Sequence, residues 1–354
     1  MSSPTLFRGR GSAKNPKGRF EHLTLEADPD VDPLEQPQPQ TQFLLDASRS
    51  VITTNKSPDV PFDASLNPYR GCEHGCSYCY ARPFHEYLGF SAGLDFETRI
   101  VVKENAPELL RKELLSPQWK PQLLGLSGVT DAYQPVERKL GITRRCLEVL
   151  AEFRNPVTVV TKNHLVTRDS DLLAQLAAYQ AASVALSITT LDPELARRLE
   201  PRASHPKRRL AAVKALSAAG IPAGVLVAPV IPGLNEHEIP SILEAAAKAG
   251  ASFAGYVLLR LPHGVGEIFS DWLESHYPDR KEKVLSLVRE TRQGRLHDPR
   301  FGSRMRGRGV YAEQIGSLFH VSRRRLGLGR RGSRLSIANF RRPGEQLLLF
   351  NTPK

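Results

Sequence analysis

The sequence contains few cysteines and no long apolar run. Four cysteines among 354 residues are too sparse for a disulfide framework. No stretch approaches the ~20 consecutive apolar residues that a membrane-spanning helix needs. Met1 to Arg19 is polar and basic, without the apolar centre of a signal peptide. These absences predict a cytoplasmic protein that keeps its thiols reduced and has no membrane partner.

Three of the four cysteines lie close together, with the spacing Cys72-xxx-Cys76-xx-Cys79. Structural zinc needs a fourth tetrahedral ligand, which only a nearby histidine or the distant Cys146 could supply. A [4Fe-4S] cluster held by three thiolates leaves one iron open to a substrate or cofactor. The spacing therefore favours such a cluster, with these three cysteines as its ligands and chemistry at the open iron.

The motif also places Tyr78 directly before the third cysteine. In this it resembles the signature of the radical S-adenosylmethionine (SAM) superfamily, and the run Cys76-Ser77-Tyr78-Cys79-Tyr80 is most similar to its spore photoproduct lyase branch. The resemblance implies that the open iron chelates SAM. One electron then cleaves SAM to methionine and a 5'-deoxyadenosyl radical, which abstracts hydrogen from a substrate. A one-electron reductant such as a flavodoxin or ferredoxin is implied as a partner.

Short apolar runs alternate with amphipathic segments from Asp63 onward. The runs expected as buried parallel strands are 63–69, 121–129, 157–161, 184–189, 223–231 and 253–261. The segments expected as helices are 106–115, 143–153, 170–180, 205–219 and 236–249. Periodicity predicts only repeated βα units of an α/β protein. The resemblance implies a partial (β/α)6 TIM-like barrel of the radical SAM type.

The composition divides the chain into three parts. Residues 1–60 are basic and then proline-rich, which predicts a mostly disordered arm because such a segment buries little apolar surface. Residues 61–264 form the expected radical SAM core. Residues 265–354 are expected to be a helical, arginine-rich extension that caps the open side of the barrel.

Polar residues recur where the expected strands end, which is the edge that carries the active site in parallel barrels. By the resemblance, Tyr78 contacts the adenine of SAM, and the backbone carbonyls of Val129 and Thr130 meet the methionine amine. Lys162 meets the methionine carboxylate, or is simply a solvated lysine. The remaining candidates for the cofactor are Ser187 and Glu200 at the ribose and Ile231 at the end of the fifth strand. Ser187 is equally typical of a small core residue, and Glu200 could instead pair with Arg202.

Two residues are candidates for catalysis. Asp131 begins a polar, turn-rich segment after the second strand, where a substrate-facing loop is expected. Tyr80 matches the tyrosine beside the cluster loop of spore photoproduct lyase. That enzyme also uses a cysteine near the end of strand two, where residues 127–130 of this chain have no thiol, so thymine-dimer reversal is not expected. Cys146 lies in a helical pattern and is expected to be a small buried residue.

The net charge of +12 comes from one part of the chain. Residues 289–342 contain fifteen arginines and three acids, and the remaining 34 basic and 34 acidic residues balance. Guanidinium groups suit phosphate, so DNA or RNA is an expected partner of this segment, although such runs are often only solvated. An alternative function is therefore a nucleic-acid-binding protein whose cluster is structural or senses redox state.

Overall fold

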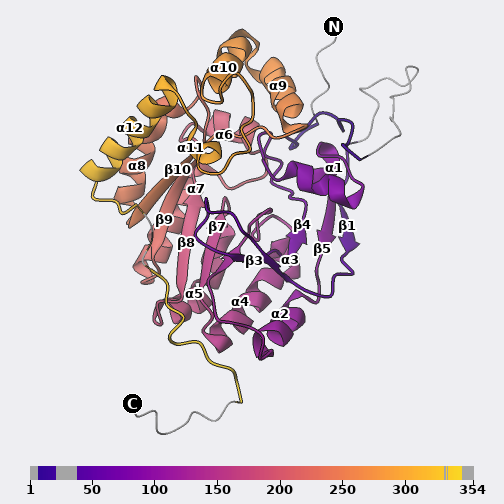
Figure 1. Cartoon of the computed structure of the whole chain (residues 1–354), viewed down its shortest axis with the longest axis vertical. Coiled ribbons are helices and arrows are strands. Elements are labelled where there is room, and N and C mark those ends of the chain that lie inside the picture. The colour runs from indigo at the N-terminus through magenta and orange to yellow at the C-terminus, as the bar shows by residue number, and fades with distance from the viewer. Residues whose placement is uncertain (1–6, 21–37, 331, 333, 345–354) are drawn as a thin grey trace.

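Seven strands form the main sheet of the protein, as seen in a computed structural model that describes residues 7–20, 38–330, 332 and 334–344. They are β2 (Ile52–Thr54), β3 (Ala64–Leu66), β6 (Leu124–Leu126), β7 (Val157–Thr161), β8 (Ala182–Ser187), β9 (Ala223–Val230) and β10 (Phe253–Leu258). Their order is β10-β9-β8-β7-β6-β3-β2 (Figure 1). The first six strands in this order run parallel, and β2 pairs antiparallel with β3. Six parallel strands confirm the expected partial barrel.

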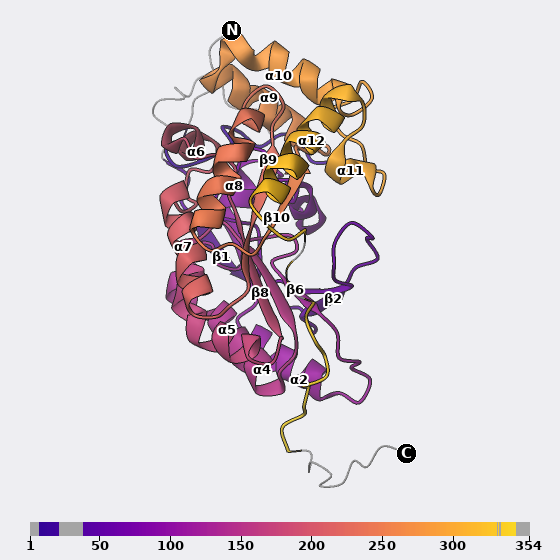
Figure 2. The ribbon, with the colours of Figure 1, turned by 90° about the vertical axis from the view of Figure 1, so that its left-hand side faces the viewer.

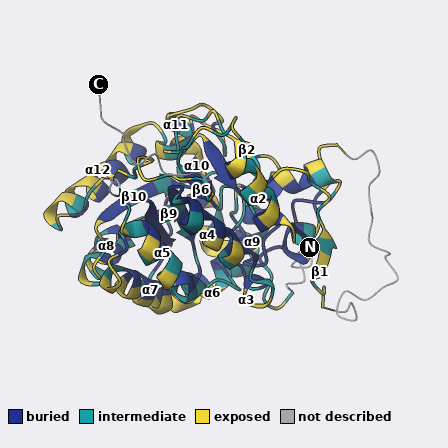
Figure 3. Ribbon diagram, turned by 90° about the horizontal axis from the view of Figure 1, so that it is seen from below, coloured by how far each residue is buried: buried dark blue, intermediate teal, exposed yellow. Residues whose placement is uncertain are grey.

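Helices cover one face of this sheet (Figure 2). They are α2 (Ala106–Leu115), α4 (Ile142–Phe153), α5 (Ser170–Ala177), α7 (Pro206–Ala218) and α8 (Ile239–Lys248), each inside or next to an expected range. All six residues of β8 are buried, as expected for a strand covered on both faces. Figure 3 shows the buried strands enclosed by helices whose outer faces are exposed. The short helices α3 (Glu137–Leu140) and α6 (Pro193–Leu199), with the 3₁₀ helices η2 (His164–Asp169) and η3 (Glu236–Glu238), lie in the connections.

A second, smaller sheet supports the loop that carries the three cysteines. It consists of β1 (Gln42–Leu45), β5 (Arg99–Val102) and β4 (Tyr69–Arg70), in the order β1-β5-β4. β4 ends just before Cys72, and the 3₁₀ helix η1 (Arg82–Leu88) and helix α1 (Leu94–Thr98) follow Cys79. The cysteine loop therefore begins on a strand and ends on a helix, so both of its ends are fixed.

The C-terminal extension is helical between residues 265 and 325, as expected, and this part lies beside the edge strand β10; residues 331, 333 and 345–354 lie outside the described residues. Its helices are α9 (Val265–His276), α10 (Pro278–Glu290), α11 (Ser303–Arg306) and α12 (Val310–Arg325). α12 packs against α8, and the ring of Phe319 lies 4.6 Å from that of Tyr256 on β10. The Gly302 N–H donates to Asp59 at 2.7 Å, in the loop between β2 and β3. The extension thus connects the two edges of the open barrel. No helix in the described part of the chain is long and apolar enough to cross a membrane.

The described part of the N-terminal arm differs from the mobile segment that its composition predicts. Residues 1–6 and 21–37 lie outside the described residues. Within 38–60, β1 pairs with β5 and β2 with β3. Residues 7–20 lie against the cysteine loop, η1, α1 and α9, through polar contacts such as that between Gly11 N and Glu97 of α1, 3.0 Å apart. Composition misses this packing because polar and backbone groups hold the segment, with little apolar burial.

Candidate active site

The three predicted ligands lie on one buried loop after β4, at the carboxyl end of the parallel strands. Cys72 and Cys76 are 7% and 6% exposed, and all four cysteines of the chain have free thiols. Gly71 and Gly75 have φ values of +78° and +66°, which glycine adopts without the steric cost of a Cβ. The loop can therefore turn sharply on both sides of Cys72.

A buried ion pair holds the loop to its supports. Arg82 is 0% exposed and pairs with Glu97, which is also fully buried. The same guanidinium donates to the carbonyl of Cys76 at 2.9 Å. Glu97 accepts from the N–H of Gly11 at 3.0 Å, and a Cβ on Gly11 would lie 1.7 Å from the carbonyl oxygen of Gly75. The residue 7–20 segment thus lies directly against the cysteine loop.

The donor set fits an iron-sulfur cluster. Burial raises the pKa of Cys72, Cys76 and Cys79, so cationic iron must favour their thiolate forms. Among the described residues, no three or more His, Cys, Asp or Glu side chains are placed to hold a single metal ion. A [4Fe-4S] cluster does not need that arrangement, because each thiolate bonds a different iron.

Tyr78 and Glu200 lie at the centre of a buried polar network beside the loop. The Tyr78 hydroxyl donates to Glu200, and Thr189 Oγ1 donates to the same carboxylate at 2.5 Å. Glu200 also pairs with the buried Arg209, and Lys162 Nζ lies 3.4 Å from it. Burial opposes ionisation of Glu200, but Arg209 and then Lys162 hold its pKa well below its usual range. Glu200 is therefore an anion that orients two predicted cofactor contacts.

The alternative prediction, that Glu200 pairs with Arg202, is wrong. Arg202 pairs with Glu73 at 3.0 Å, in the cysteine loop, whereas Glu200 pairs with Arg209. Leu199, next to Glu200, accepts a hydrogen bond from the N–H of Ser77 at 3.1 Å. This contact fixes the Glu200 segment next to the loop and leaves Arg202 to reach a different acid.

Asp131 lies between β6 and β7, with most of its hydrogen-bonding capacity in use. It accepts from the Lys162 N–H at 2.7 Å, from Thr161 Oγ1 at 2.7 Å and from the Tyr133 N–H at 2.9 Å. His74 Nδ1, in the cysteine loop, lies 3.4 Å away. Burial disfavours the charged carboxylate, but His74 and the hydrogen bonds lower the pKa of Asp131. These contacts join the ends of two strands to the loop.

The remaining predicted cofactor residues gather around the same loop. Val129 packs against the apolar group formed by Cys72 and its neighbours, and Ile231 belongs to the group that contains Cys76 and Tyr78. Thr130 Oγ1 donates to the carbonyl of Tyr69 at 3.3 Å. The carbonyl of Ser187, at the end of β8, accepts from Arg209 at 2.9 Å, so Ser187 is joined to the Glu200 network through Arg209.

Tyr80 lies at the outer edge of the loop. Its side chain is 43% exposed, its hydroxyl donates to the carbonyl of Gly128 at 2.8 Å, and the Arg260 guanidinium lies 5.1 Å from its ring centroid. Cys146 is 0% exposed in the apolar core on α4, as its helical pattern predicts. It therefore lies among core residues, apart from the groups around the other three cysteines.

Several residues of the network have no signal in the sequence. Arg209 lies in the run Lys207-Arg208-Arg209, where arginines are normally solvated, yet it is 1% exposed. Thr189 has only its place just after a strand to distinguish it. Glu97 and Arg82 are ordinary charged residues until the fold brings them together. Each of them contacts a residue on a different element or loop, such as Glu200 for Arg209 and Glu97 for Arg82, and spacing along the chain does not reveal such contacts.

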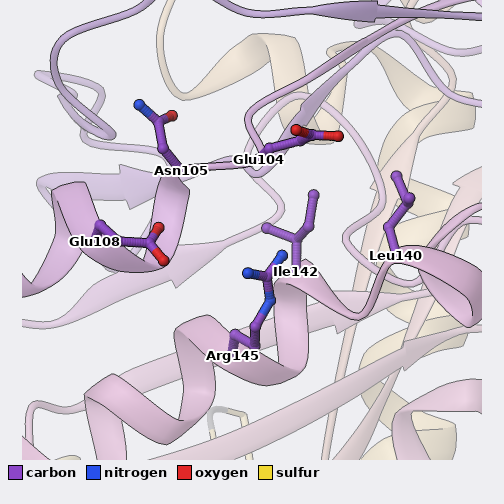
Figure 4. Close-up of a pocket in the computed structure, with 6 residues that line it drawn as sticks. All are labelled: Glu104, Asn105, Glu108, Leu140, Ile142 and Arg145. Atoms are coloured by element: carbon purple, nitrogen blue, oxygen red, sulfur yellow. The ribbon is translucent and has the colours of Figure 1, made fainter.

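Two hollows on the described part of the surface lie outside this network. One, of about 340 Å³, lies between α2 and α4 (Figure 4). Figure 4 shows Glu104, Asn105 and Glu108 on one side and Arg145 on the other, so its walls carry charges of both signs. The other, of about 410 Å³, lies beside η2. No predicted site residue lines either hollow.

The fold and the site together define a partial α/β barrel with a three-cysteine loop at the carboxyl ends of its strands. Comparison with known proteins agrees, because the radical SAM superfamily profile matches residues 66–246. The chain therefore belongs to the radical SAM superfamily, whose general mechanism uses a [4Fe-4S] cluster and SAM.

The chain is also similar to individual known proteins. An uncharacterised protein of Mycobacterium tuberculosis is 38% identical over 240 residues, which cover 66% of this chain and 71% of that protein. An uncharacterised protein of Methanocaldococcus jannaschii is 29% identical over 237 residues, covering 67% and 84%. Among solved structures, spore photoproduct lyase complexed with dinucleoside spore photoproduct has a TM-score of 0.57 and 17% identity, covering 81% of this chain and 80% of that one. This last likeness is one of fold.

Proposed function

We propose that this protein is a radical SAM enzyme that acts on a nucleic acid. Cys72, Cys76 and Cys79 would hold the cluster, and SAM would bind at its open iron. When bound, the two cofactors supply a 5'-deoxyadenosyl radical that abstracts hydrogen from the substrate. The observation that carries the proposal is the buried loop of three free thiols beside the Tyr78–Glu200 network. A reducing cytoplasm suits these thiols.

The proposed contacts with SAM are inferred from the contacts that the candidate side chains make with one another. Tyr78 and Lys162 are oriented by Glu200 and are proposed to meet the adenine and the methionine carboxylate. The carbonyls of Val129 and Thr130 are proposed for the methionine amine. Glu200 itself is proposed to position Tyr78 and Lys162, because Arg209 and Thr189 already engage its oxygens.

Two further predicted contacts complete this set. Ser187 is proposed at the ribose, and Ile231 is proposed to pack beside the cofactor with Cys76 and Tyr78. For catalysis, Asp131 is proposed to hold the substrate-side loop, since its contacts already join β6 to β7. Tyr80 is proposed as the group nearest the substrate, because it is exposed beside the cluster ligand Cys79.

Two exposed aromatic rings, each with a guanidinium group over its face, support the nucleic-acid part of the proposal. Tyr80 and Phe301 are 43% and 57% exposed. Arg260 lies over the first ring at 5.1 Å, and Arg304 lies over the second at 4.5 Å. Aromatic faces stack on unpaired bases and guanidinium groups attract phosphates, so single-stranded DNA or RNA suits this surface.

Anaerobic reconstitution with iron and sulfide, followed by dithionite and SAM, tests the enzyme. We expect 5'-deoxyadenosine from the wild type. The variants Cys72→Ala, Cys76→Ala and Cys79→Ala should each form none and bind less iron. Cys146→Ala, which removes a core thiol outside the loop, is the matched control and should retain both. A wild-type protein that binds a full cluster but releases no 5'-deoxyadenosine would instead favour a structural or redox-sensing cluster. A polynucleotide that raises the yield identifies the substrate class.

A further inference from the structure

The hollow of about 410 Å³ beside η2 is lined mainly by basic and neutral polar side chains. They come from α3, η2 and α7 and from the turns just before η2 and α7: Arg138, Asn163, His164, Leu165, Thr167, Arg168, Ser204 and Arg208. None of the eight is an acid. Arg168 is compensated by Glu137 and Asp169. Among the described residues, neither Arg138 nor Arg208 has a carboxylate partner, and both are exposed.

The hollow is therefore a place where positive charge is concentrated and not internally neutralised. Arg208 Nη2 lies 3.5 Å from His164 Nδ1. Burial, and then the Arg208 charge, lower the pKa of His164, so His164 is neutral near pH 7. Lys139 and Lys207 are exposed on the same short segments. An approaching surface that carries carboxylates would relieve the repulsion between these cations.

The floor of the hollow is connected to the cysteine loop. Asn163 is 7% exposed, and its Nδ2 lies 3.2 Å from Nε2 of His74, which lies between Cys72 and Cys76. Ser204 Oγ donates to Asn163 Oδ1 at 3.0 Å and so holds this amide in place. The side chains of Asn163 and His74, which contact each other, therefore link the hollow to the backbone of the cysteine loop.

Other sides of the loop are covered or are needed for substrate. The residue 7–20 segment covers Gly75, and Arg82 and Glu97 are buried beneath the loop. Tyr80 and its arginine neighbour lie at the edge assigned above to the substrate. A donor that must reach the cluster while substrate is bound needs another face. The hollow offers one, on the outer helical layer that carries α7 (Figure 2).

We propose that the Arg138–Arg208 hollow is the docking site for an acidic one-electron carrier protein. The carrier passes one electron to the cluster, is itself oxidised by one electron and transfers no atom. Carboxylates of the carrier would pair with Arg138 and Arg208, and the Asn163–His74 contact provides the shortest bridge of side chains to the loop. This inference rests on the proposed function, since only a redox-active cluster needs the electron.

Binding of reduced bacterial flavodoxin to the reconstituted full chain tests the proposal. The variant Arg138→Glu/Arg208→Glu should weaken binding at least about tenfold at low salt, because two attractive pairs become repulsive. Arg138→Lys/Arg208→Lys keeps the charge and should stay within about threefold. The matched control Arg280→Glu/Lys283→Glu changes the same charge on exposed positions of α10 and should bind as the wild type does. Iron content and circular dichroism confirm that each variant is folded.

A second measurement separates this proposal from the proposed function. With flavodoxin as reductant, 5'-deoxyadenosine formation should fall in the Arg138→Glu/Arg208→Glu variant, whereas with dithionite it should equal the wild type. Unchanged flavodoxin affinity overturns the docking site, and so does a variant that loses binding to single-stranded DNA but not to flavodoxin. Wild-type protein that binds flavodoxin but forms no 5'-deoxyadenosine with dithionite refutes the enzyme and leaves the docking surface standing.

Discussion

Glu200 is the single residue on which most of the buried polar contacts beside the loop depend. It is 2% exposed, and its carboxylate serves Tyr78, Thr189 and Arg209 at once. A charge in this position is tolerated only because a guanidinium and several donors surround it. Removing the charge would leave Arg209, 1% exposed, without its counterion.

The variant Glu200→Gln should therefore destabilise the fold strongly. We expect the free energy of unfolding to fall by about 3–5 kcal/mol, the usual loss when one partner of a buried pair is removed. Guanidinium denaturation of the apoprotein measures it. Glu194→Gln removes an exposed carboxylate and is the control, which should unfold at the same denaturant concentration as the wild type. A loss of under about 1 kcal/mol in Glu200→Gln would contradict the assigned role.

The lowered pKa of Glu200 also predicts a pH dependence. Its ordinary value is 4.5, and although burial opposes ionisation, Arg209 and Lys162 shift the folded value below it. A carboxylate with a lowered pKa stabilises the fold above the unfolded value and loses that contribution as pH falls towards the folded value. The stability difference between the wild type and Glu200→Gln should shrink below about pH 4.5. Denaturation midpoints from about pH 7 to pH 3 measure it, and a constant difference would be inconsistent with the shift.

The sequence located some of these residues and could not locate others, for a physical reason. Cys72, Cys76 and Cys79 are identified by spacing because all three ligands lie within one short loop. Lys162 and Ser187 lie at strand ends, the edge that carries the site in parallel barrels, whereas Glu200 is predicted only by the resemblance; all three lie in or beside the network. Arg209 could not be found, since its role depends on a contact between separate elements.

At the scale of elements, the residue 7–20 segment and the cysteine loop behave as one unit. The segment contributes Gly11 beneath Gly75 and an ion pair from Lys14 to Glu267 on α9, 2.7 Å long. Arg19 pairs with Glu86 on η1. These contacts join the loop, η1 and α9, which are far apart in the chain. Hydrophobic periodicity predicted the strands and helices of the core well but gave no sign of this packing, because it does not report polar contacts.

The variant Gly11→Ala should detach this segment from the loop. The new methyl group would lie 1.7 Å from the carbonyl oxygen of Gly75, and backbone on both sides cannot yield without moving. We expect faster cleavage of the N-terminal segment by trypsin and faster loss of cluster absorbance in air. Lys17→Arg, at an exposed position of the same segment, keeps the trypsin site and is the control that should match the wild type. Equal rates in all three proteins would show that the segment does not protect the loop.

At the scale of the whole molecule, the arginine excess in residues 289–342 serves two purposes. Arg292 is 2% exposed and donates to the carbonyls of Leu258 and Leu259, so it fastens the extension to the end of β10. Arg304 forms an ion pair with Asp59 in the loop between β2 and β3, and so holds the extension to the other edge of the open barrel. Other members, including Arg308 and Arg324, are exposed. The charge therefore both binds the extension to the barrel and leaves a basic outer face, a division that the sequence alone cannot make.

The exposed arginines are those that should bind nucleic acid. Truncation after residue 288 would test this poorly, because it removes Phe319 from its contact with Tyr256 on β10. Arg308→Glu/Arg324→Glu leaves that packing intact and should weaken binding to single-stranded DNA. Each lost phosphate contact should make the plot of the logarithm of the binding constant against the logarithm of the salt concentration less steep, by about 0.7 in slope. Fluorescence anisotropy over a salt series measures this slope. Arg280→Glu/Lys283→Glu makes the same charge change on α10, outside the arginine-rich segment, and should keep the wild-type slope. If both pairs lower the slope equally, binding follows net charge, and residues 289–342 have no special part in it.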